Sequence, residues 1–275
     1  MPLFPPTSAR ARQFLRTAPP FLWHLLTGRP VTISAIAANL FQGLVPPARV
    51  QGTEWIPPDS PFVVLINHYE NPQVAAWWAP ALVTRIVAER RKSEPREVHW
   101  VMASAWSYPG GFGRYVKQPL TKLLFQRIAQ VLGLVLVPPV LEGDPNRGQG
   151  VTGVRQALSL TRGPTPRLIG IAPEGHAGPG GQLKAPPPGA GLFLLLLTHD
   201  TIPCLPVGWY QDEQNGITIR FGAPFQLQAP RSKDREARDH AAAAQAMVEI
   251  GKLLPERLGG VYRDQIDQGN MANAV

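Results

Sequence analysis

Short apolar runs of strand length, separated by longer segments with helical periodicity, place the strongest constraint on how this chain folds. Residues 62–66, 168–172 and 203–208 are mainly apolar and too short to be complete helices. Residues 73–90 and 190–198, in contrast, have the length and apolar spacing of helices. This alternation predicts an α/β domain with a single, largely parallel sheet flanked by helices.

The other expected elements continue the same alternation. The expected strands are 98–103, 134–137 and an edge strand at 217–221, and the expected helices are 120–132, 151–161 and a surface helix at 234–254. With 275 residues, 44% of them hydrophobic, the chain is long enough to bury a sizeable core. We therefore expect one α/β domain over residues 46–265 and a frayed tail over residues 266–275.

The first 45 residues differ in composition from the rest. The segment before Glu54 contains five arginines and no acidic residue. It therefore supplies five of the eight net positive charges of the whole chain. Residues 20–26 and 30–41 read as two short helices, so we expect a basic helical hairpin facing a membrane with anionic lipids. A solvated basic end is the alternative. An Arg-rich targeting peptide is a further one.

Membrane crossing and secretion are both unexpected for this sequence. No apolar run approaches the roughly 20 residues that a spanning helix needs. Cys204 is the single cysteine, so no internal disulfide can form and a reducing compartment is the default. We expect a cytoplasmic protein that is peripheral on the membrane.

Two polar loops follow apolar strands and are the candidate sites for chemistry. Residues 67–73 (Asn-His-Tyr-Glu-Asn-Pro-Gln) follow the first strand, and residues 173–178 (Pro-Glu-Gly-His-Ala-Gly) follow the 168–172 strand. Ligands gather at the carboxyl ends of parallel strands. His68 can remove a proton from a hydroxyl if an acceptor holds its other ring nitrogen. A histidine bonded only to loop backbone is the alternative.

The loops and a third segment, Ile202 to Val207, resemble successive motifs of the glycerophospholipid O-acyltransferase family. The ending Gly259-Gly260-Val261-Tyr262 is similar to that of many bacterial members, so the resemblance covers about residues 48–262. It implies that His68 is the general base and that acyl-CoA or acyl carrier protein is the acyl donor, with no bound cofactor. It also implies that Pro173, Glu174 and Gly175 shape the acceptor pocket, and we expect Asn67 and His176 in the same loops to contact the acceptor as well.

The chain departs from the family pattern at three positions. The family's aspartate five residues after the histidine is Gln73 here, which can accept a hydrogen bond but carries no charge. In the serine protease triad, a comparable neutral replacement lowers turnover by about 10⁴-fold. Glu70 is the nearest alternative carboxylate. Two family arginines are replaced by Ala177 and by the 137–139 segment, which makes lysophosphatidate a less favoured acceptor unless other side chains take their place. The possible substitutes are His176, Lys184 and Arg114.

Two other functions compete with acyl transfer. Loss of chemistry through Gln73 would leave a lipid-binding or partner-binding module with the same fold. The pairs His68-x-Glu70 and Glu174-x-His176 could hold a divalent metal for hydrolysis, although the spacing is common and we expect no metal. No nucleic-acid-binding motif is recognisable, so nucleic acid is not an expected partner. The sequence predicts no oligomeric state.

Overall fold

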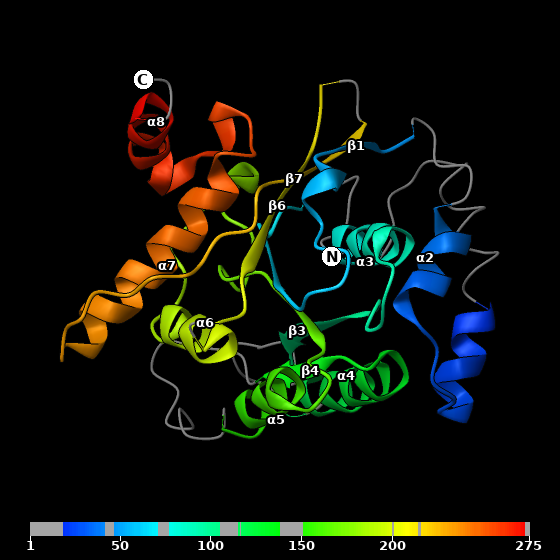
Figure 1. Ribbon diagram of the computed structural model, residues 1–275. Helices are drawn as coiled ribbons and strands as arrows, with labels where there is room; N and C mark the ends of the chain where they lie inside the picture. Colours follow the sequence, from blue (N-terminus) through cyan, green and yellow to red (C-terminus); the bar gives the residue numbers. More distant parts are fainter. Residues whose placement is uncertain are drawn as a thin grey trace.

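The computed structural model describes residues 19–41, 47–70, 77–104, 115, 117–137, 151–199, 201–213 and 216–272. These residues form a seven-stranded sheet in the order β1-β7-β6-β2-β5-β3-β4 (Figure 1). The strands are β1 (Arg49–Gln51), β2 (Val63–Ile66), β3 (Val98–Ala103), β4 (Val135–Val137), β5 (Leu168–Ile171), β6 (Cys204–Gln211) and β7 (Ile217–Phe221).

Helices connect and cover these strands. A helix over residues 19–27 precedes the others. The other described α-helices are α2 (Ile33–Leu40), α3 (Trp78–Arg90), α4 (Gln118–Leu132), α5 (Val151–Arg162), α6 (Ala190–Thr198), α7 (Arg235–Gly251) and α8 (Arg263–Ala272). Short 3₁₀ helices lie at Thr53–Trp55, Pro179–Gly181, Glu256–Leu258 and Gly260–Tyr262. Of the described helices, none combines the length and the apolar character needed to cross a membrane.

The sheet is largely parallel. Strands β6, β2, β5, β3 and β4 run in one direction, whereas β7 is antiparallel to β6 and β1 is parallel to β7. From β2 the chain moves through α3 and α4 toward β4, and then returns through α5 and α6 to β6. Right-handed crossovers place connections that move in opposite directions on opposite faces of the sheet. The direction of winding therefore reverses between the neighbouring strands β2 and β5.

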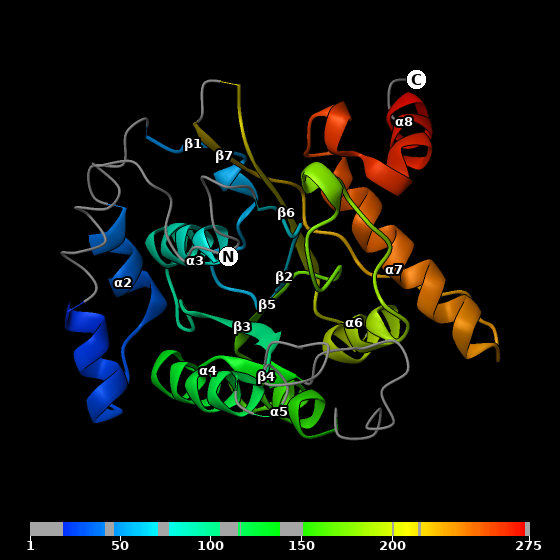
Figure 2. The ribbon, with the colours of Figure 1, turned by 180° about the vertical axis from the view of Figure 1, so that it is seen from behind.

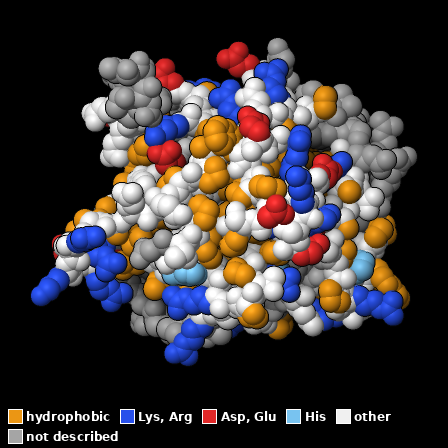
Figure 3. Space-filling model, in the orientation of Figure 1, with side chains coloured by type: hydrophobic (Ala, Val, Ile, Leu, Met, Phe, Trp, Pro, Cys, Tyr) orange, Lys and Arg blue, Asp and Glu red, His pale blue; other side chains and the backbone are white. Residues whose placement is uncertain are grey.

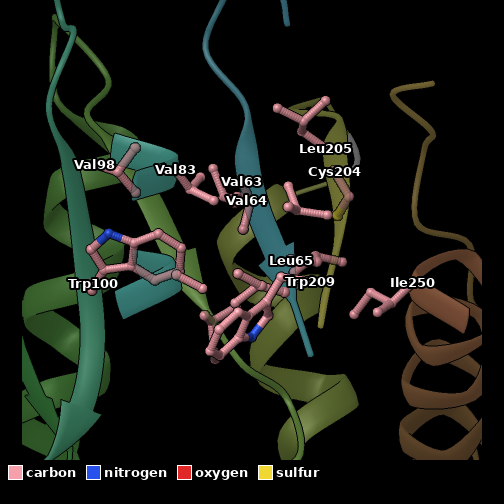
Figure 4. Packing of buried hydrophobic residues seen from close by; sticks show 14 of the residues in the cluster. Val63, Val64, Leu65, Val83, Val98, Trp100, Cys204, Leu205, Trp209 and Ile250 are labelled. Atoms are coloured by element: carbon pink, nitrogen blue, oxygen red, sulfur yellow. The ribbon is translucent and has the colours of Figure 1, made fainter. Parts of the chain in front are cut away.

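Buried side chains from both faces fill the core. α3 packs with α2, whereas α6 packs with α5 and α7. Figure 4 shows Val83 of α3 and Ile250 of α7 on opposite sides of β2. Strands β2 and β5 are buried along their whole length, as continuous apolar strands with helices on both faces should be. The predicted α/β class with a single, largely parallel sheet is confirmed.

Three local differences from the sequence expectations concern elements with weak signals. β7 is not an edge strand, because β1 pairs with it and forms the edge. Residues 263–272 form α8, and Ile266 is buried in the core, so the frayed tail expected from residue 266 is wrong for this part. α2 packs into the main core through Ile33, Ala37 and Phe41, which joins the second helix of the expected hairpin to the α/β unit.

Candidate active site

The two candidate loops lie side by side at the carboxyl edge of the sheet. His68 follows the end of β2 by two residues, and Glu174 follows the end of β5 by three. Because β2 and β5 are parallel neighbours, their carboxyl ends open at the same place. This place is also where the direction of winding reverses, which is the usual ligand site of open α/β sheets.

Glu174 joins the two loops through its carboxylate. Its side chain is 1% exposed, and one oxygen accepts a hydrogen bond from the backbone N–H of His68 at 2.6 Å. The other oxygen accepts from the backbone N–H of Lys184 at 3.0 Å. Burial raises the pKa of Glu174 to about 7, and the two backbone bonds and the charge of Lys184 oppose that rise. Glu174 is therefore a buried clamp between three segments of chain.

The imidazole of His68 is neutral and only partly satisfied. Burial, together with the nearby His176 and Lys184, lowers the pKa of His68 to about 4. Its Nδ1 atom is buried and has no hydrogen-bond partner among the described residues. At neutral pH the ring consequently has a free lone pair for a proton, and one ring nitrogen still lacks the group that would orient it.

Neither predicted orienting group can be assigned to His68. Glu70 is half-buried, and its charge raises the pKa of His176, whereas it is not among the groups that shift the pKa of His68. The unpartnered Nδ1 shows that Glu70 makes no hydrogen bond to this ring atom. Gln73 lies outside the described residues. Its predicted contact with His68 stays a prediction.

Asn67 has its side-chain amide engaged by the neighbouring strand. The amide donates to the carbonyl oxygen of Trp209 at 2.9 Å and accepts from the N–H of Trp209 at 2.8 Å. The indole of Trp209 also donates to the carbonyl oxygen of Asn67 at 2.9 Å. These bonds continue the β2–β6 pairing by one residue and fix the start of the His68 loop. The geometry gives Asn67 a structural role, and its predicted contact with an acceptor stays untested.

The remaining residues of the predicted acceptor site form the turn after β5. Pro173 is buried, whereas Gly175 and His176 are exposed. The N–H of Gly175 donates to the carbonyl oxygen of Ala172 at 3.1 Å, which closes a turn that presents Glu174 inward. The ammonium of Lys184 contacts the ring of His176. Of the three proposed substitute cations, Lys184 thus reaches the site, and Arg114 lies outside the described residues.

Tyr262 is a buried residue beside the site, and no sequence motif indicated this position for it. Its side chain is 7% exposed, and burial together with the charge of Glu174 raises the pKa of its hydroxyl to about 12. Tyr262 lies near enough for this effect because Val261 and Leu258 pair with the backbone of Leu183, next to Lys184. The resemblance of residues 259–262 to the ending of many family members drew attention to this region. It did not indicate which loop these residues contact in the folded chain.

Comparisons with known proteins yield likenesses among solved structures only. No protein-family model and no curated protein matches the chain. Among solved structures, the chain is similar to the crystal structure of the 1-acyl-sn-glycerophosphate (LPA) acyltransferase PlsC from Thermotoga maritima, at 17% sequence identity and a TM-score of 0.46. The match covers 76% of this chain and 73% of that one. The fold class itself follows from the strand order and directions described above.

The geometry favours proton transfer over metal chemistry. The described residues contain no group of three or more His, Cys, Asp or Glu side chains that could hold a metal ion. Both oxygens of Glu174 face backbone N–H groups, and the ammonium of Lys184 occupies the space beside His176 where a cation would bind. The two His/Glu pairs therefore do not form such a group among the described residues. A neutral histidine beside a clamped acid loop suits removal of a proton from a hydroxyl.

Proposed function

We propose that the protein is an O-acyltransferase that moves an acyl group from acyl-CoA or acyl carrier protein to a hydroxyl of a glycerolipid-like acceptor at a membrane surface. The observation that carries the proposal is the clamp by Glu174, which holds the neutral His68 at the reversal point of the sheet. The order of the sequence motifs supports it, because two of them supply these residues.

The chemistry is acyl transfer in which His68 moves the proton. The free ring nitrogen of His68 takes the proton of the acceptor hydroxyl, and the hydroxyl oxygen attacks the thioester carbonyl carbon. The tetrahedral intermediate then collapses with cleavage of the carbon–sulfur bond. The departing thiolate takes the proton from the imidazolium, which returns His68 to its neutral form and releases an oxygen ester and a free thiol. No covalent enzyme intermediate is needed.

Exposed apolar side chains support the membrane part of the proposal. In the 19–27 helix Leu22, Trp23 and Leu26 are 54%, 57% and 70% exposed, and in α4 Leu120 and Leu123 are 65% and 64% exposed. The guanidinium of Arg127 in α4 donates to the carbonyl oxygens of Leu25 and Leu26 at 2.6 and 2.9 Å, which fixes the two helices side by side. Figure 3 shows hydrophobic and basic side chains at the lower right, where the dark blue 19–27 helix lies in Figure 1.

This apolar surface carries basic residues and reaches the site's end of the molecule. Residues 19–41 and 117–132 contain no Asp or Glu, and Arg29, Lys117 and Lys122 are exposed. α4 connects the carboxyl end of β3 to the start of the parallel strand β4, so its first turns lie at the same sheet edge as His68. Tryptophan and leucine beside lysine and arginine are the side chains of an interfacial helix on anionic lipid.

The test of catalysis is thiol release from acyl-CoA across a panel of hydroxyl acceptors. We expect the wild-type protein to release thiol with at least one acceptor and H68A to lower the rate by 10²-fold or more. H240A is the matched control, because His240 is exposed on α7 and, in the part of the chain that the structure describes, forms an ion pair with Glu236 alone. If no acceptor gives release that depends on His68, catalysis is wrong and the binding-module alternative holds.

Replacement of Gln73 tests whether His68 lacks an orienting acid. We expect Q73D to raise the rate of thiol release by at least tenfold, since an aspartate would fix the ring and stabilise the imidazolium. The same substitution should raise the pKa of His68 in an NMR titration. E70Q, in contrast, should change the rate little, because Glu70 acts on His176 rather than on His68. A large loss in E70Q with no gain in Q73D would identify Glu70 as the partner.

A further inference from the structure

A basic cavity lies directly beside the candidate active site. Its volume is about 360 Å³, and residues of the 179–184 segment and of the 256–263 segment line it. Figure 2 shows the yellow-green segment after β5 rising toward the orange and red C-terminal segment that contains these turns. The cavity thus lies between two segments that are far apart in sequence.

Three basic side chains and one acidic side chain line this cavity. The basic ones are Lys184, Arg257 and Arg263, and the acidic one is Glu256, which pairs with Arg263. The described lining therefore has a surplus of two positive charges. Among the described residues, the guanidinium of Arg257 makes one hydrogen bond, to the carbonyl oxygen of Gln211 at 3.0 Å. Most of the five guanidinium N–H donors of Arg257 are left for a ligand.

Backbone bonds hold the cavity walls in a fixed relation to each other. The N–H of Leu183 donates to the carbonyl oxygen of Leu258 at 2.9 Å, and the N–H of Val261 donates to the carbonyl oxygen of Leu183 at 3.3 Å. Gly260 has a φ of +53°, and a Cβ there would collide with the carbonyl oxygen of Leu183. Only glycine allows this close approach, so Gly260 is required for the contact between the two segments.

The same wall connects the cavity to the catalytic loops. Lys184 is one of the residues that line the cavity, and its N–H donates to Glu174. Glu174 in turn holds the backbone of His68. The charge of Lys184 also lowers the pKa of His68. An anion seated against Lys184 would consequently lie next to the reacting hydroxyl.

We propose that this cavity binds a phosphate dianion through Lys184, Arg257 and Arg263, and that it selects acyl acceptors carrying such a group. The inference rests on the proposed acyl transfer for its second half only. Guanidinium groups bind phosphate oxygens bidentately, and the surplus of two positive charges matches the two negative charges of a phosphate monoester. The cations come from the 184 position and the C-terminal turn, whereas the positions expected to carry phosphate contacts hold Ala177 and the 137–139 segment.

The direct test is calorimetric titration of the full chain with inorganic phosphate and with glycerol 3-phosphate, at constant ionic strength. We expect both to bind, and the double variant R257Q/R263Q to weaken both affinities at least tenfold. R235Q/R238Q makes the same change of charge at the start of α7, about 24 Å along that helix from its end. It should bind like the wild type. Thermal unfolding should show all three proteins to be folded, since Arg257 and Arg263 are exposed.

The outcomes separate the cavity from the catalytic proposal. Binding of glycerol 3-phosphate but not of inorganic phosphate would assign the site to headgroups, and equal binding would assign it to the phosphate itself; both support the cavity. Absence of binding by the wild type, or equal affinity in R257Q/R263Q, would overturn it. Thiol release that depends on His68 is measured separately, so it can stand when the cavity fails. If R257Q/R263Q raises the KM for phosphate-bearing acceptors alone, acceptor selection is supported, and an unchanged KM overturns it.

Discussion

Glu174 is buried and accepts two hydrogen bonds, and its pKa differs between the folded and unfolded states. The free energy of unfolding therefore depends on whether this carboxyl group is protonated. Its pKa is about 7 in the folded protein, above the ordinary value of 4.5, so the folded state holds the proton more tightly than the unfolded state. The contribution of Glu174 to stability is therefore present at acidic pH and is lost as the pH rises through 7. His68 acts in the opposite sense, because its lowered pKa costs stability as the pH falls from 6.5 toward 4.

Replacing Glu174 with glutamine isolates the first of these two terms. We expect the stability of the wild type relative to E174Q to be greater at pH 5 than at pH 8 by about 2 kcal/mol, because glutamine has no charge to lose. Urea unfolding at both pH values measures the difference. E54Q, at an exposed position, should show no such pH dependence. A relative stability of the wild type that increases with pH would contradict the burial of Glu174.

Arg91 is a second buried charge, and its role is to hold a loop. It is 3% exposed and donates to four backbone carbonyls, three in residues 57–60 and one at residue 95, while its guanidinium lies 5.4 Å from the ring of Phe62. We expect R91M to lower the free energy of unfolding by roughly 3 kcal/mol, because it leaves these carbonyls without their donor. Denaturant unfolding of R90M, at the exposed neighbouring position, should show a loss below about 0.5 kcal/mol.

At this scale the sequence predicted the residues that follow strands better than those that meet through long-range contacts. His68 and Glu174 were predicted to share one sheet edge, and the structure places them one hydrogen bond apart. Asn67 donates a hydrogen bond to Trp209, and the charge of Glu174 acts on Tyr262. Both pairs consist of residues that are far apart in sequence. No local pattern encodes such pairs, since they depend on strand order and on where the chain end docks.

The α6–α7 contact shows how two elements on one face are fixed. A Cβ at Gly191 would collide with the backbone oxygen of Asp239 in α7. The carboxylate of Asp239 accepts from the N–H groups of Gly189 and Leu192 at 2.6 and 2.8 Å, so α7 supplies the cap for the start of α6. Close helix approach and capping thus occur at the same point.

Adding one methyl group at this contact should be costly. We expect G191A to lower the free energy of unfolding by about 2 kcal/mol, because the two helices must separate and the cap from Asp239 is weakened. Gly163 offers a matched control, since a Cβ there would meet only an ordinary contact at 3.5 Å. Thermal or urea unfolding of G191A and G163A compares the two. Equal stability of the two variants would show that α6 and α7 are free to shift.

Elements with strong periodicity or long apolar runs were predicted, and short or polar ones were not. The predicted helix at 190–198 is α6 residue for residue. β1 has three residues and all are exposed, so it has no alternation to detect. α8 has a polar sequence and is anchored by Ile266 against Gly251, a contact that only the folded chain provides. Strand order was equally hidden, because it is a property of packing rather than of any segment.

For the whole molecule, the two ends of the chain have different relations to the site. The C-terminal turns pack beside Glu174 and supply the basic cavity, whereas the 19–27 helix and α4 carry exposed apolar side chains. Because α2 is part of the core, removing residues 1–45 would disturb folding as well as any membrane contact. Point substitutions on exposed side chains test the membrane surface without that complication.

Membrane association should depend on the exposed side chains of the 19–27 helix and α4. We expect W23Q and L123Q each to weaken binding to vesicles with anionic lipid by about tenfold, since insertion of one such side chain contributes roughly 1.5–3 kcal/mol. Co-sedimentation with vesicles measures this. L196Q is the control, because Leu196 is 45% exposed but lies on α6, which packs with α5 and α7 rather than with α2 and α3. If L196Q loses as much affinity as W23Q, binding follows general hydrophobicity and the oriented placement is wrong.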